Sequence, residues 1–315
     1  MSRDKKLAHF MMAILVIAWG FDYVPAKWGL EVMSPMVLLF FKYAVGVAVM
    51  LIIKAVQKNW TVIRLKDVPI FIICAIVGEI IYFGCEYSAM DYLPVSLITI
   101  ILTFVPVVSI VSERIIYKRS ATKKIIIGIL ICIVGVTLVI GTDFSVIMQG
   151  RGIGYLLAIG AVLSWNGYNF ITASLERYDS ITISFTQMLC TIILLTPMAI
   201  HNIPPASEFN KWIIFGILWI GIVNSGVGFL IYVYGLQKLG PTTMALYSDF
   251  LPVSTTFFGA LMLKESISTL QIIGGIIVVG AAFVVIREKG RVDEEREAVE
   301  RAEAERQKET SDGPI

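Results

Sequence analysis

The feature that most restricts the fold of this chain is a series of long apolar runs joined by short connections. Ten such runs are present, at 7–28, 35–56, 68–88, 94–116, 123–141, 153–175, 180–200, 212–236, 241–262 and 269–286. A helix needs about 20 mostly apolar residues to cross the ~30 Å hydrocarbon core of a bilayer. Helices are predicted because lipid-exposed strands would leave backbone groups unpaired, and the alternation of a barrel is absent. The predicted fold class is an all-α integral membrane protein with ten transmembrane helices.

The distribution of charge supports this prediction. Residues 1–286 carry only 33 of the 50 charged side chains, and the remaining 17 lie in residues 287–315. A soluble domain has roughly 25% charged residues, so the first 286 residues could not cover their apolar surface in water. This composition excludes soluble enzymes and nucleic-acid-binding domains, and it predicts the lipid bilayer as the partner of the chain. Residues 287–315 are predicted to be a charged cytoplasmic tail.

Lysine and arginine residues indicate the orientation of the chain in the membrane. They gather before the first run, at 54–66, at 114–124 and after residue 286, which are all on one side if the runs span alternately. Positively charged loops remain in the cytoplasm. We therefore expect a multi-pass protein of the inner cell membrane with both termini in the cytoplasm.

The chain also contains an internal repeat. A shift of 146 residues places Trp19 on Trp165 and Phe83 on Phe229, and it places the Phe-Val-Pro-Val sequence at 104–107 on Phe-Leu-Pro-Val at 250–253. The predicted units are residues 1–146 and 147–286, with five spans each. Because five is odd, the second unit enters the membrane in the opposite direction. Such inverted repeats are typical of transporters with a site near the midplane.

Two motifs resemble those of a known family. The first is Trp-Gly-Phe-Asp-Tyr-Val-Pro-Ala-Lys at 19–27, and the second joins Phe-Leu-Pro-Val at 250–253 to Lys-Glu-Ser at 264–266 and Gly-Gly at 274–275. They resemble the drug/metabolite transporter superfamily, EamA type. The resemblance implies secondary transport of small metabolites, often amino acids or amines, through a cavity lined by spans 1, 3, 4, 6, 8 and 9. The acidic residues Asp22, Glu79 and Asp249 and the lysine Lys42 depart from the common pattern.

Charged residues at membrane depth are the main candidates for a site, because each costs about 2.5–3.5 kcal/mol at the bilayer centre. At about 1.5 Å per residue, Glu79 lies about 14 Å and Asp249 about 12 Å from the nearest membrane surface. A carboxylate kept from water at the midplane can exchange a proton or bind a cation. The alternative is that neighbouring polar groups satisfy both and that they only fix helix packing.

A second pair of charges is predicted nearer the outer surface. Asp22 in the first span and Lys42 in the second both lie roughly 10 Å below it, at about 1.5 Å per residue. Consecutive antiparallel helices are usually neighbours, so a salt bridge between the two is expected. It can serve either as a structural ion pair or as a substrate contact.

Aromatic side chains share helical faces with these charges. Residues spaced by three, four and seven positions lie on one stripe of a helix. Three such stripes contain Trp19, Asp22 and Tyr23, then Glu79, Tyr82 and Glu86, then Trp165, Tyr168 and Asn169. Aromatic rings and carboxylates together favour an organic cation. The alternative for single rings is packing or the interfacial belt. Pro106 and Pro252, inside the fourth and ninth runs, are expected to bend their helices.

These features predict a secondary active transporter that works by alternating access as an exporter or proton exchanger. The predicted substrate is a small cationic or zwitterionic metabolite, such as an amine, an amino acid or a drug-like cation. A membrane-embedded enzyme and a passive channel are the alternatives, although no catalytic or phosphate-binding motif is present. No cofactor or metal is predicted. The fifth and tenth runs, almost purely Ile, Val, Leu and Gly, are predicted to pack or to form a homodimer.

Overall fold

The computed structural model describes residues 3–58, 60–117, 122–140, 152–175, 177–248 and 250–311, and within them it contains only helices, turns and irregular segments. The helices of the first half are α1 (Arg3–Leu30), α2 (Pro35–Gln57), η1 (Leu65–Asp67), α3 (Val68–Cys74), η2 (Ala75–Ile81), α4 (Tyr82–Ala89), α5 (Val95–Leu102), α6 (Val105–Tyr117) and α7 (Lys123–Ile140). Those of the second half are α9 (Gly152–Ala173), α10 (Ser180–Ala199), η4 (Ile200–Asn202), η5 (Ala206–Glu208), α11 (Lys211–Trp219), η6 (Ile220–Gly228), α12 (Phe229–Ser248), α13 (Leu251–Met262) and α14 (Thr269–Ser311). The predicted all-helical class is confirmed.

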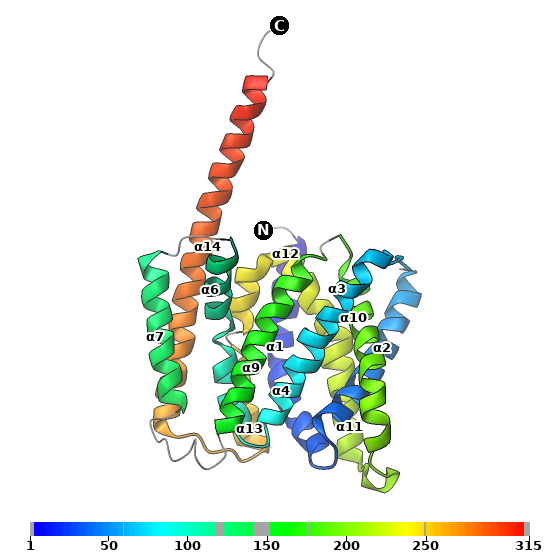
Figure 1. Ribbon diagram of the computed structural model, residues 1–315. Helices are drawn as coiled ribbons and strands as arrows, with labels where there is room; N and C mark the ends of the chain where they lie inside the picture. The colour runs from blue at the N-terminus through cyan, green and yellow to red at the C-terminus, as the bar shows by residue number, and fades with distance from the viewer. Residues whose placement is uncertain are drawn as a thin grey trace.

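Six helical segments of the described residues are long and apolar enough to cross a membrane. They are Asp4–Leu30, Pro35–Gln57, Leu65–Ala89, Val95–Ser112, Ser180–Asn202 and Lys211–Gly235. Each coincides with one of the apolar runs of the sequence. The long axes of the helices lie side by side, and α1 begins at the same end of the bundle from which α14 emerges (Figure 1).

Two of the helical segments contain a stretch of π-helix in the middle. The first is η2, between α3 and α4, and the second is η6, between α11 and α12. A shift of 146 residues carries Ala75–Ile81 onto 221–227, which lies inside η6. A π segment widens the helix and displaces its hydrogen bonds, and such segments are frequent at functional sites. The two halves of the chain therefore share an irregularity at matching positions.

The sequence predicted that Pro106 and Pro252 bend continuous helices. This prediction was wrong, because each proline lies at the start of a separate helix. Instead α5 ends at Leu102 and α6 begins at Val105, so Pro106 occupies the first turn of a new helix. Pro252 likewise stands in the first turn of α13. Proline is tolerated there because the first turn has no internal partner for its missing N–H group. The connection predicted at 237–240 is helical instead, because α12 continues to Ser248.

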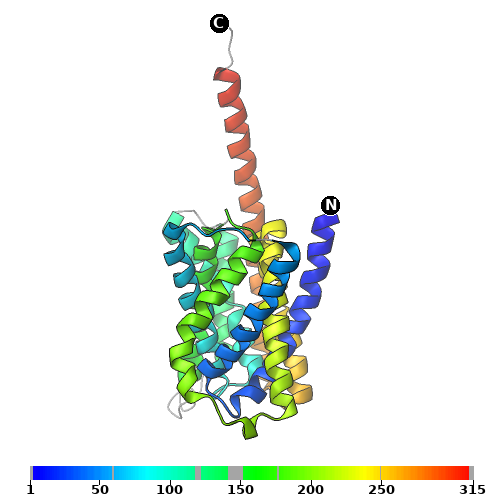
Figure 2. The ribbon, with the colours of Figure 1, turned by 90° about the vertical axis from the view of Figure 1, so that its right-hand side faces the viewer.

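The two halves interlock through their first helices. Helix α1 packs against α11, η6 and α12, while α9 packs against α3, η2 and α4. Helix α2 contacts both α10 and η6. In Figure 2 the blue α1 and the yellow α12 lie next to each other although they are far apart in the sequence. Both π segments therefore lie at contacts between the two halves.

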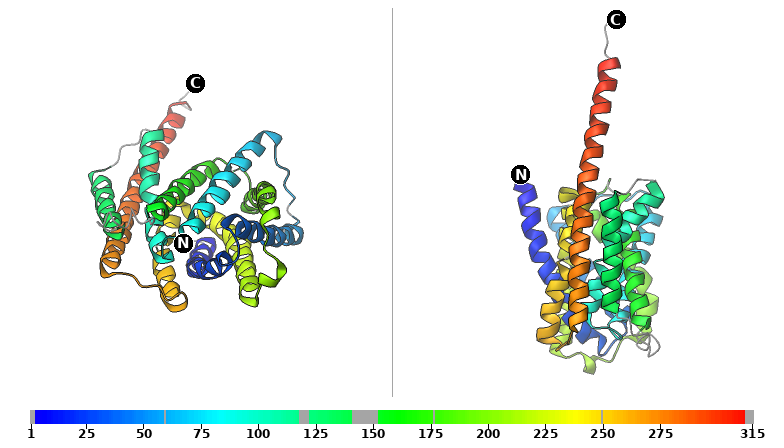
Figure 3. Two further views of the ribbon diagram at one scale, coloured as in Figure 1. Left: turned by 60° about the horizontal axis from the view of Figure 1, so that its bottom comes forward. Right: turned by 90° about the vertical axis from the view of Figure 1, so that its left-hand side faces the viewer.

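Helices α7 and α14 form a separate pair at one side of the bundle (Figures 1 and 3). Gly128 and Gly135 of α7 let Val285 and Val278 of α14 approach closely, because a side chain at either glycine would overlap the valine. Helix α14 then continues to Ser311 and projects from the bundle (Figure 1). Most of the charged tail is thus helical and continuous with the last apolar run.

An ionic cluster joins the start of α7 to the middle of α14, where the charged tail begins. Glu288 accepts hydrogen bonds from Arg291, at 2.8 Å from Nη2, and its carboxylate lies 3.7 Å from Nζ of Lys124. The hydrogen bond from Arg291 and the charges of both basic groups lower the pKa of Glu288. The contribution of this carboxylate to stability is therefore present above the ordinary pKa of a glutamate and is lost as pH falls through the lowered value.

Candidate functional site

Four charged side chains are buried together in the first half of the chain. They are Asp22 of α1, Lys42 of α2, Glu79 of η2 and Glu86 of α4, and none is more than 5% exposed. The three carboxylates interact electrostatically with the ammonium group of Lys42, Glu79 most strongly. We call these four residues the charged cluster. Buried charges in a membrane helix are expensive and usually mark a pathway for substrate or ions.

Asp22 receives both of its hydrogen bonds from the second half of the chain. Its Oδ1 accepts from Nε1 of Trp219 at 2.6 Å, and its Oδ2 accepts from Nδ2 of Asn224 at 2.6 Å. The π segment η6 carries Asn224, so this irregular helix positions a donor for a carboxylate of α1. The predicted salt bridge between Asp22 and Lys42 does not form: the carboxylate is bonded to these two N–H groups, and Nζ of Lys42 has no hydrogen-bond partner among the described residues.

Glu79 is fully buried in the π segment η2. The hydroxyl of Tyr43 donates a hydrogen bond to Oε2, while Oε1 has no partner among the described residues. The neighbouring Gly78 lets the ring of Tyr168 pack directly on this helix, since a Cβ there would overlap the ring. A tyrosine hydroxyl can either donate or accept, so Glu79 is compatible with both of its protonation states.

Glu86 lies seven residues, about two helical turns, further along and accepts hydrogen bonds from two tyrosines. Its Oε1 accepts from the hydroxyl of Tyr23 at 2.6 Å and from that of Tyr82 at 2.9 Å. The predicted site residues Tyr23 and Tyr82 are therefore partners of a carboxylate. They come from α1 and α4, so Glu86 ties these two helices together.

Lys42 has no hydrogen-bond partner for its ammonium group in the part of the chain that the structure describes. Its Nζ lies 3.0 Å from the centre of the Phe83 ring, and 5.3 and 5.6 Å from the rings of Tyr43 and Tyr87. Attraction between the cation and these ring faces replaces part of the missing hydration. Nζ of Lys42 thus lies against aromatic ring faces, and no carboxylate oxygen of the charged cluster lies within 4.0 Å of it.

The predicted aromatic residues form one continuous wall. The Trp165 ring stacks on Tyr168 at 5.0 Å between centres and lies 4.7 Å from Tyr82, while Trp19 lies 5.5 Å from Tyr232. We call this set the aromatic wall; its members are Trp19, Tyr82, Trp165, Tyr168, Phe229 and Tyr232. Both tryptophans contact Tyr232. The third stripe residue, Asn169, accepts a long hydrogen bond of 3.4 Å from Tyr232.

The two halves of the chain contribute different chemistry to the site. The positions 146 residues after the four members of the charged cluster are Tyr168, Met188, Ser225 and Tyr232, none of which is charged. Three of these four residues carry a hydroxyl group and two are aromatic. The site therefore has a charged side from the first half and a largely aromatic side from the second.

The sequence identified most of these residues and missed some. Asp22, Tyr23, Lys42, Glu79 and Tyr82 lie together in the structure, although the sequence put Asp22 and Lys42 in a pair separate from Glu79. Asp249 lies outside the described residues. Trp219, Asn224, Phe229 and Tyr232 were not predicted. Phe229 and Tyr232 could have been found by applying the 146-residue shift to Phe83 and Glu86.

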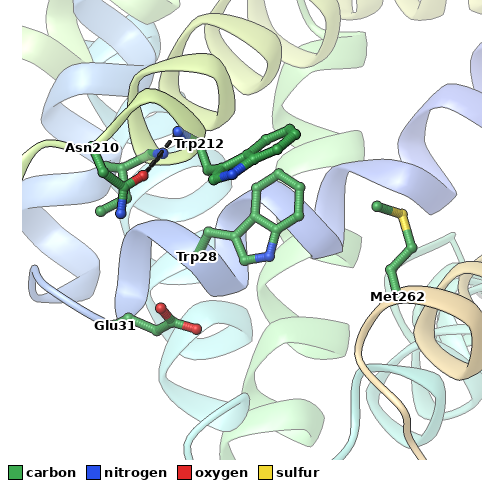
Figure 4. Close-up of a pocket in the computed structure, with 6 residues that line it drawn as sticks. Trp28, Glu31, Asn210, Trp212 and Met262 are labelled. Atoms are coloured by element: carbon green, nitrogen blue, oxygen red, sulfur yellow. Dashed lines mark hydrogen bonds between the residues drawn. The ribbon is translucent and has the colours of Figure 1, made fainter.

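A pocket of about 410 Å³ lies elsewhere, near the end of α1 and the start of α11 (Figure 4). Its lining contains none of the predicted site residues and consists of Trp28, Glu31, Asn210, Trp212, Ile213 and Met262. The rings of Trp28 and Trp212 are 5.7 Å apart, and both lie near helix ends, as expected for an interfacial aromatic belt. Among the described residues, no three His, Cys, Asp or Glu side chains are grouped to hold a metal ion.

A bundle of apolar helices with buried charges between two similar halves defines a polytopic membrane protein with an internal polar site. The chain belongs to the EamA-like transporter family, which matches it twice, at residues 6–141 and 152–287. The two matches confirm that the family resemblance and the repeat seen in the sequence cover nearly the whole apolar region. Membership of a transporter family points away from an enzyme.

Similar proteins are transporters of unspecified substrate. The uncharacterized transporters YoaV and YvbV of Bacillus subtilis (strain 168) are 21% and 23% identical to this chain. The alignments cover 86% and 89% of this chain, and 93% and 92% of the relatives. An uncharacterized transporter of Archaeoglobus fulgidus is 21% identical, covering 89% of this chain and 98% of its own. A solved crystal structure, 17% identical, has the same fold with a TM-score of 0.64, over 88% of this chain and 97% of that one.

Proposed function

We propose that this protein is a secondary active transporter that exchanges a small cationic or zwitterionic metabolite for protons across the inner cell membrane. The observation that carries the proposal is the charged cluster, in which Glu79 keeps one buried carboxylate oxygen without a partner. That oxygen is free to take a proton or the ammonium group of a substrate. Amines, amino acids and drug-like cations are the substrate classes that fit, and export is the direction that the family resemblance favours.

The proposed mechanism of transport is alternating access. In the proposed ten-helix arrangement of two inverted repeats, 1–146 and 147–286, the charged cluster and the aromatic wall lie where the two halves meet. The breaks before Val105 and Leu251 and the π segments η2 and η6 are positions at which helices can change their direction. Rocking of one half against the other would then expose the cluster to each side in turn. A homodimer through α7 and α14 stays a prediction.

Flux measurements in sealed proteoliposomes test the proposed function. With the purified protein, a pH gradient of one unit should drive accumulation of a transported amine or amino acid to a ratio of about ten. The reason is that one pH unit is worth about 1.4 kcal/mol per exchanged proton, a tenfold ratio. Uptake that only equilibrates at any pH gradient would favour a passive channel, and conversion of the solute would favour an enzyme. Protein-free liposomes are the control.

Reporter fusions test the proposed orientation. A reporter joined after Ile315 should be active in the cytoplasm, and one inserted at Pro204 should be active outside, because this loop lies at the end of the bundle opposite the one from which α14 projects (Figure 1). The reason is the concentration of lysine and arginine at the end where both termini lie. A tagged variant that keeps transport provides the folding control. Both reporters on one side of the membrane would contradict the proposed topology.

A further inference from the structure

The ammonium group of Lys42 is the starting point, because it is buried without being paired. Its side chain is not exposed at all, and none of its three N–H donors has an acceptor among the described residues. A buried donor without an acceptor carries a desolvation penalty, which is larger for a charged group. A bound molecule that brings an acceptor would remove this penalty.

None of the neighbouring carboxylates forms a hydrogen bond or an ion pair with Lys42 in the part of the chain that the structure describes. Asp22 is occupied by the N–H groups of Trp219 and Asn224. The Oε1 of Glu86 is occupied by the hydroxyl groups of Tyr23 and Tyr82. Within the described part of the chain, no carboxylate oxygen lies within 4.0 Å of Nζ of Lys42. Asp22 and Glu86 are thus bonded to other donors, and the ammonium group of Lys42 has no acceptor among the described residues.

Glu79 has a buried carboxylate oxygen, Oε1, that lacks a hydrogen-bond donor among the described residues. Its Oε2 accepts from Tyr43, the ring of which lies 5.3 Å from Nζ of Lys42, and its Oε1 is buried without a donor. The charged cluster therefore contains a fully buried cationic donor and a fully buried anionic acceptor that both lack a partner among the described residues. They are linked through the single residue Tyr43.

We propose that Lys42 is the specificity-determining residue of the site and binds the anionic group of a zwitterionic substrate whose ammonium group binds Glu79. This inference rests on the proposed function and narrows its substrate class. A simple amine would place a second positive charge beside Lys42. A simple carboxylate would meet the negative charges of Asp22, Glu79 and Glu86. Like charges brought together in a desolvated site select strongly against such ligands.

Besides its anionic group and its ammonium group, the substrate is expected to carry an apolar side group, which the aromatic wall would contact. The rings of Trp165, Tyr168 and Phe229 lie within 6.4 Å of one another, between centres. Their faces suit an apolar side group and contribute no charge. Phenylalanine, phenethylamine and 3-phenylpropionate are suitable probes, because they share the side group and differ in which charges they carry. Leucine and isopentylamine form a second pair without a ring.

Binding of these probes to the purified full-length protein tests the inference. The wild-type protein should bind phenylalanine about 10- to 100-fold more tightly than phenethylamine or 3-phenylpropionate, as expected for one charge-assisted hydrogen bond. In Lys42→Met, binding of phenylalanine should weaken by about the same factor, and phenethylamine should bind at least as well as before. Methionine stands at the matching position of the second half, Met188.

Lys54→Met is the matched control. Lys54 lies in the same helix, is also buried, and its Nζ is 5.3 Å from the ring of Phe185. It is 12 residues from Lys42, about 18 Å along the helix at ~1.5 Å per residue, so its replacement should leave the ligand preference unchanged.

Several outcomes would overturn the inference. One is wild-type binding of the amines as tight as that of the matching amino acids, and another is no binding of either amino acid. An unchanged preference in Lys42→Met, or an equal change in Lys54→Met, would do the same. If Lys42→Met does not fold, the wild-type comparison of the probes still decides. Failure of the proposed function can be distinguished from failure of this inference. If only the proposed function fails, the protein binds the probes with the predicted preference but shows no pH-driven flux.

Discussion

Replacement of Glu79 with glutamine is expected to abolish accumulation driven by a pH gradient. Glutamine keeps the shape of the side chain and can accept the hydrogen bond from Tyr43, but it cannot ionise. The accumulation ratio should therefore fall from about ten to one for a gradient of one pH unit, since one exchanged proton supplies a tenfold ratio. The variant should fold, because a neutral amide is cheaper to bury than a charge. Flux in proteoliposomes with and without the gradient is the measurement.

Glu86→Gln is the matched control for this prediction. Glu86 is buried in the neighbouring helix α4, but the hydroxyl groups of Tyr23 and Tyr82 both bond to its Oε1. We expect this variant to keep pH-driven accumulation. Equal loss in both variants would mean that the two carboxylates share one proton and titrate as a pair, which contradicts the assignment to Glu79 alone. Full accumulation in Glu79→Gln would remove Glu79 from proton exchange altogether.

Replacement of Asp22 with leucine is expected to destabilise the protein by about 3–5 kcal/mol, the usual cost of removing one partner from a buried charged group. The variant leaves Nε1 of Trp219 and Nδ2 of Asn224 buried without an acceptor, and it removes one of the negative charges near Lys42. Thermal unfolding in detergent, followed by size-exclusion chromatography, measures the effect. Asp91→Leu, at an exposed position between α4 and α5, is the control and should unfold with the wild type.

The ranking of two further variants sharpens this prediction. Asp22→Asn should cost less than Asp22→Leu, because its oxygen can still accept from Trp219 and Asn224 can turn its free Oδ1 toward the new amide. Adding Lys42→Met to Asp22→Leu should recover part of the loss, because residues in one electrostatic network are not additive. An Asp22→Leu protein that unfolds at the wild-type temperature would show that these bonds contribute nothing to the fold.

Much of the site could be predicted because depth in a membrane follows from position along a helix. The distance of Glu79 from the end of its apolar run placed it deep in the bundle, and it is fully buried. Helical spacing placed Tyr23 beside Asp22 and Tyr82 beside Glu79 on common stripes. These predictions use only local geometry, which each helix has regardless of its neighbours.

The predicted salt bridge shows where local geometry is not enough. Asp22 and Lys42 lie at similar depths in consecutive helices, yet the partners of Asp22 are 197 and 202 residues away. Trp219 and Asn224 reach it because α1 packs against α11 and η6 of the other half. The course of the fourth and ninth runs was also mistaken, because a proline that begins a new helix and one that bends a continuous helix have the same sequence signal.

The sequence by itself determined the helical membrane class, the family and the two similar halves. Each follows from hydrophobic length and residue spacing, which are properties of single segments. The tertiary structure decided which donors satisfy Asp22 and Glu86, and it left Lys42 and one oxygen of Glu79 unpaired. Hydrogen bonds act over about 3 Å, so their partners are fixed only when helices from distant parts of the chain pack together.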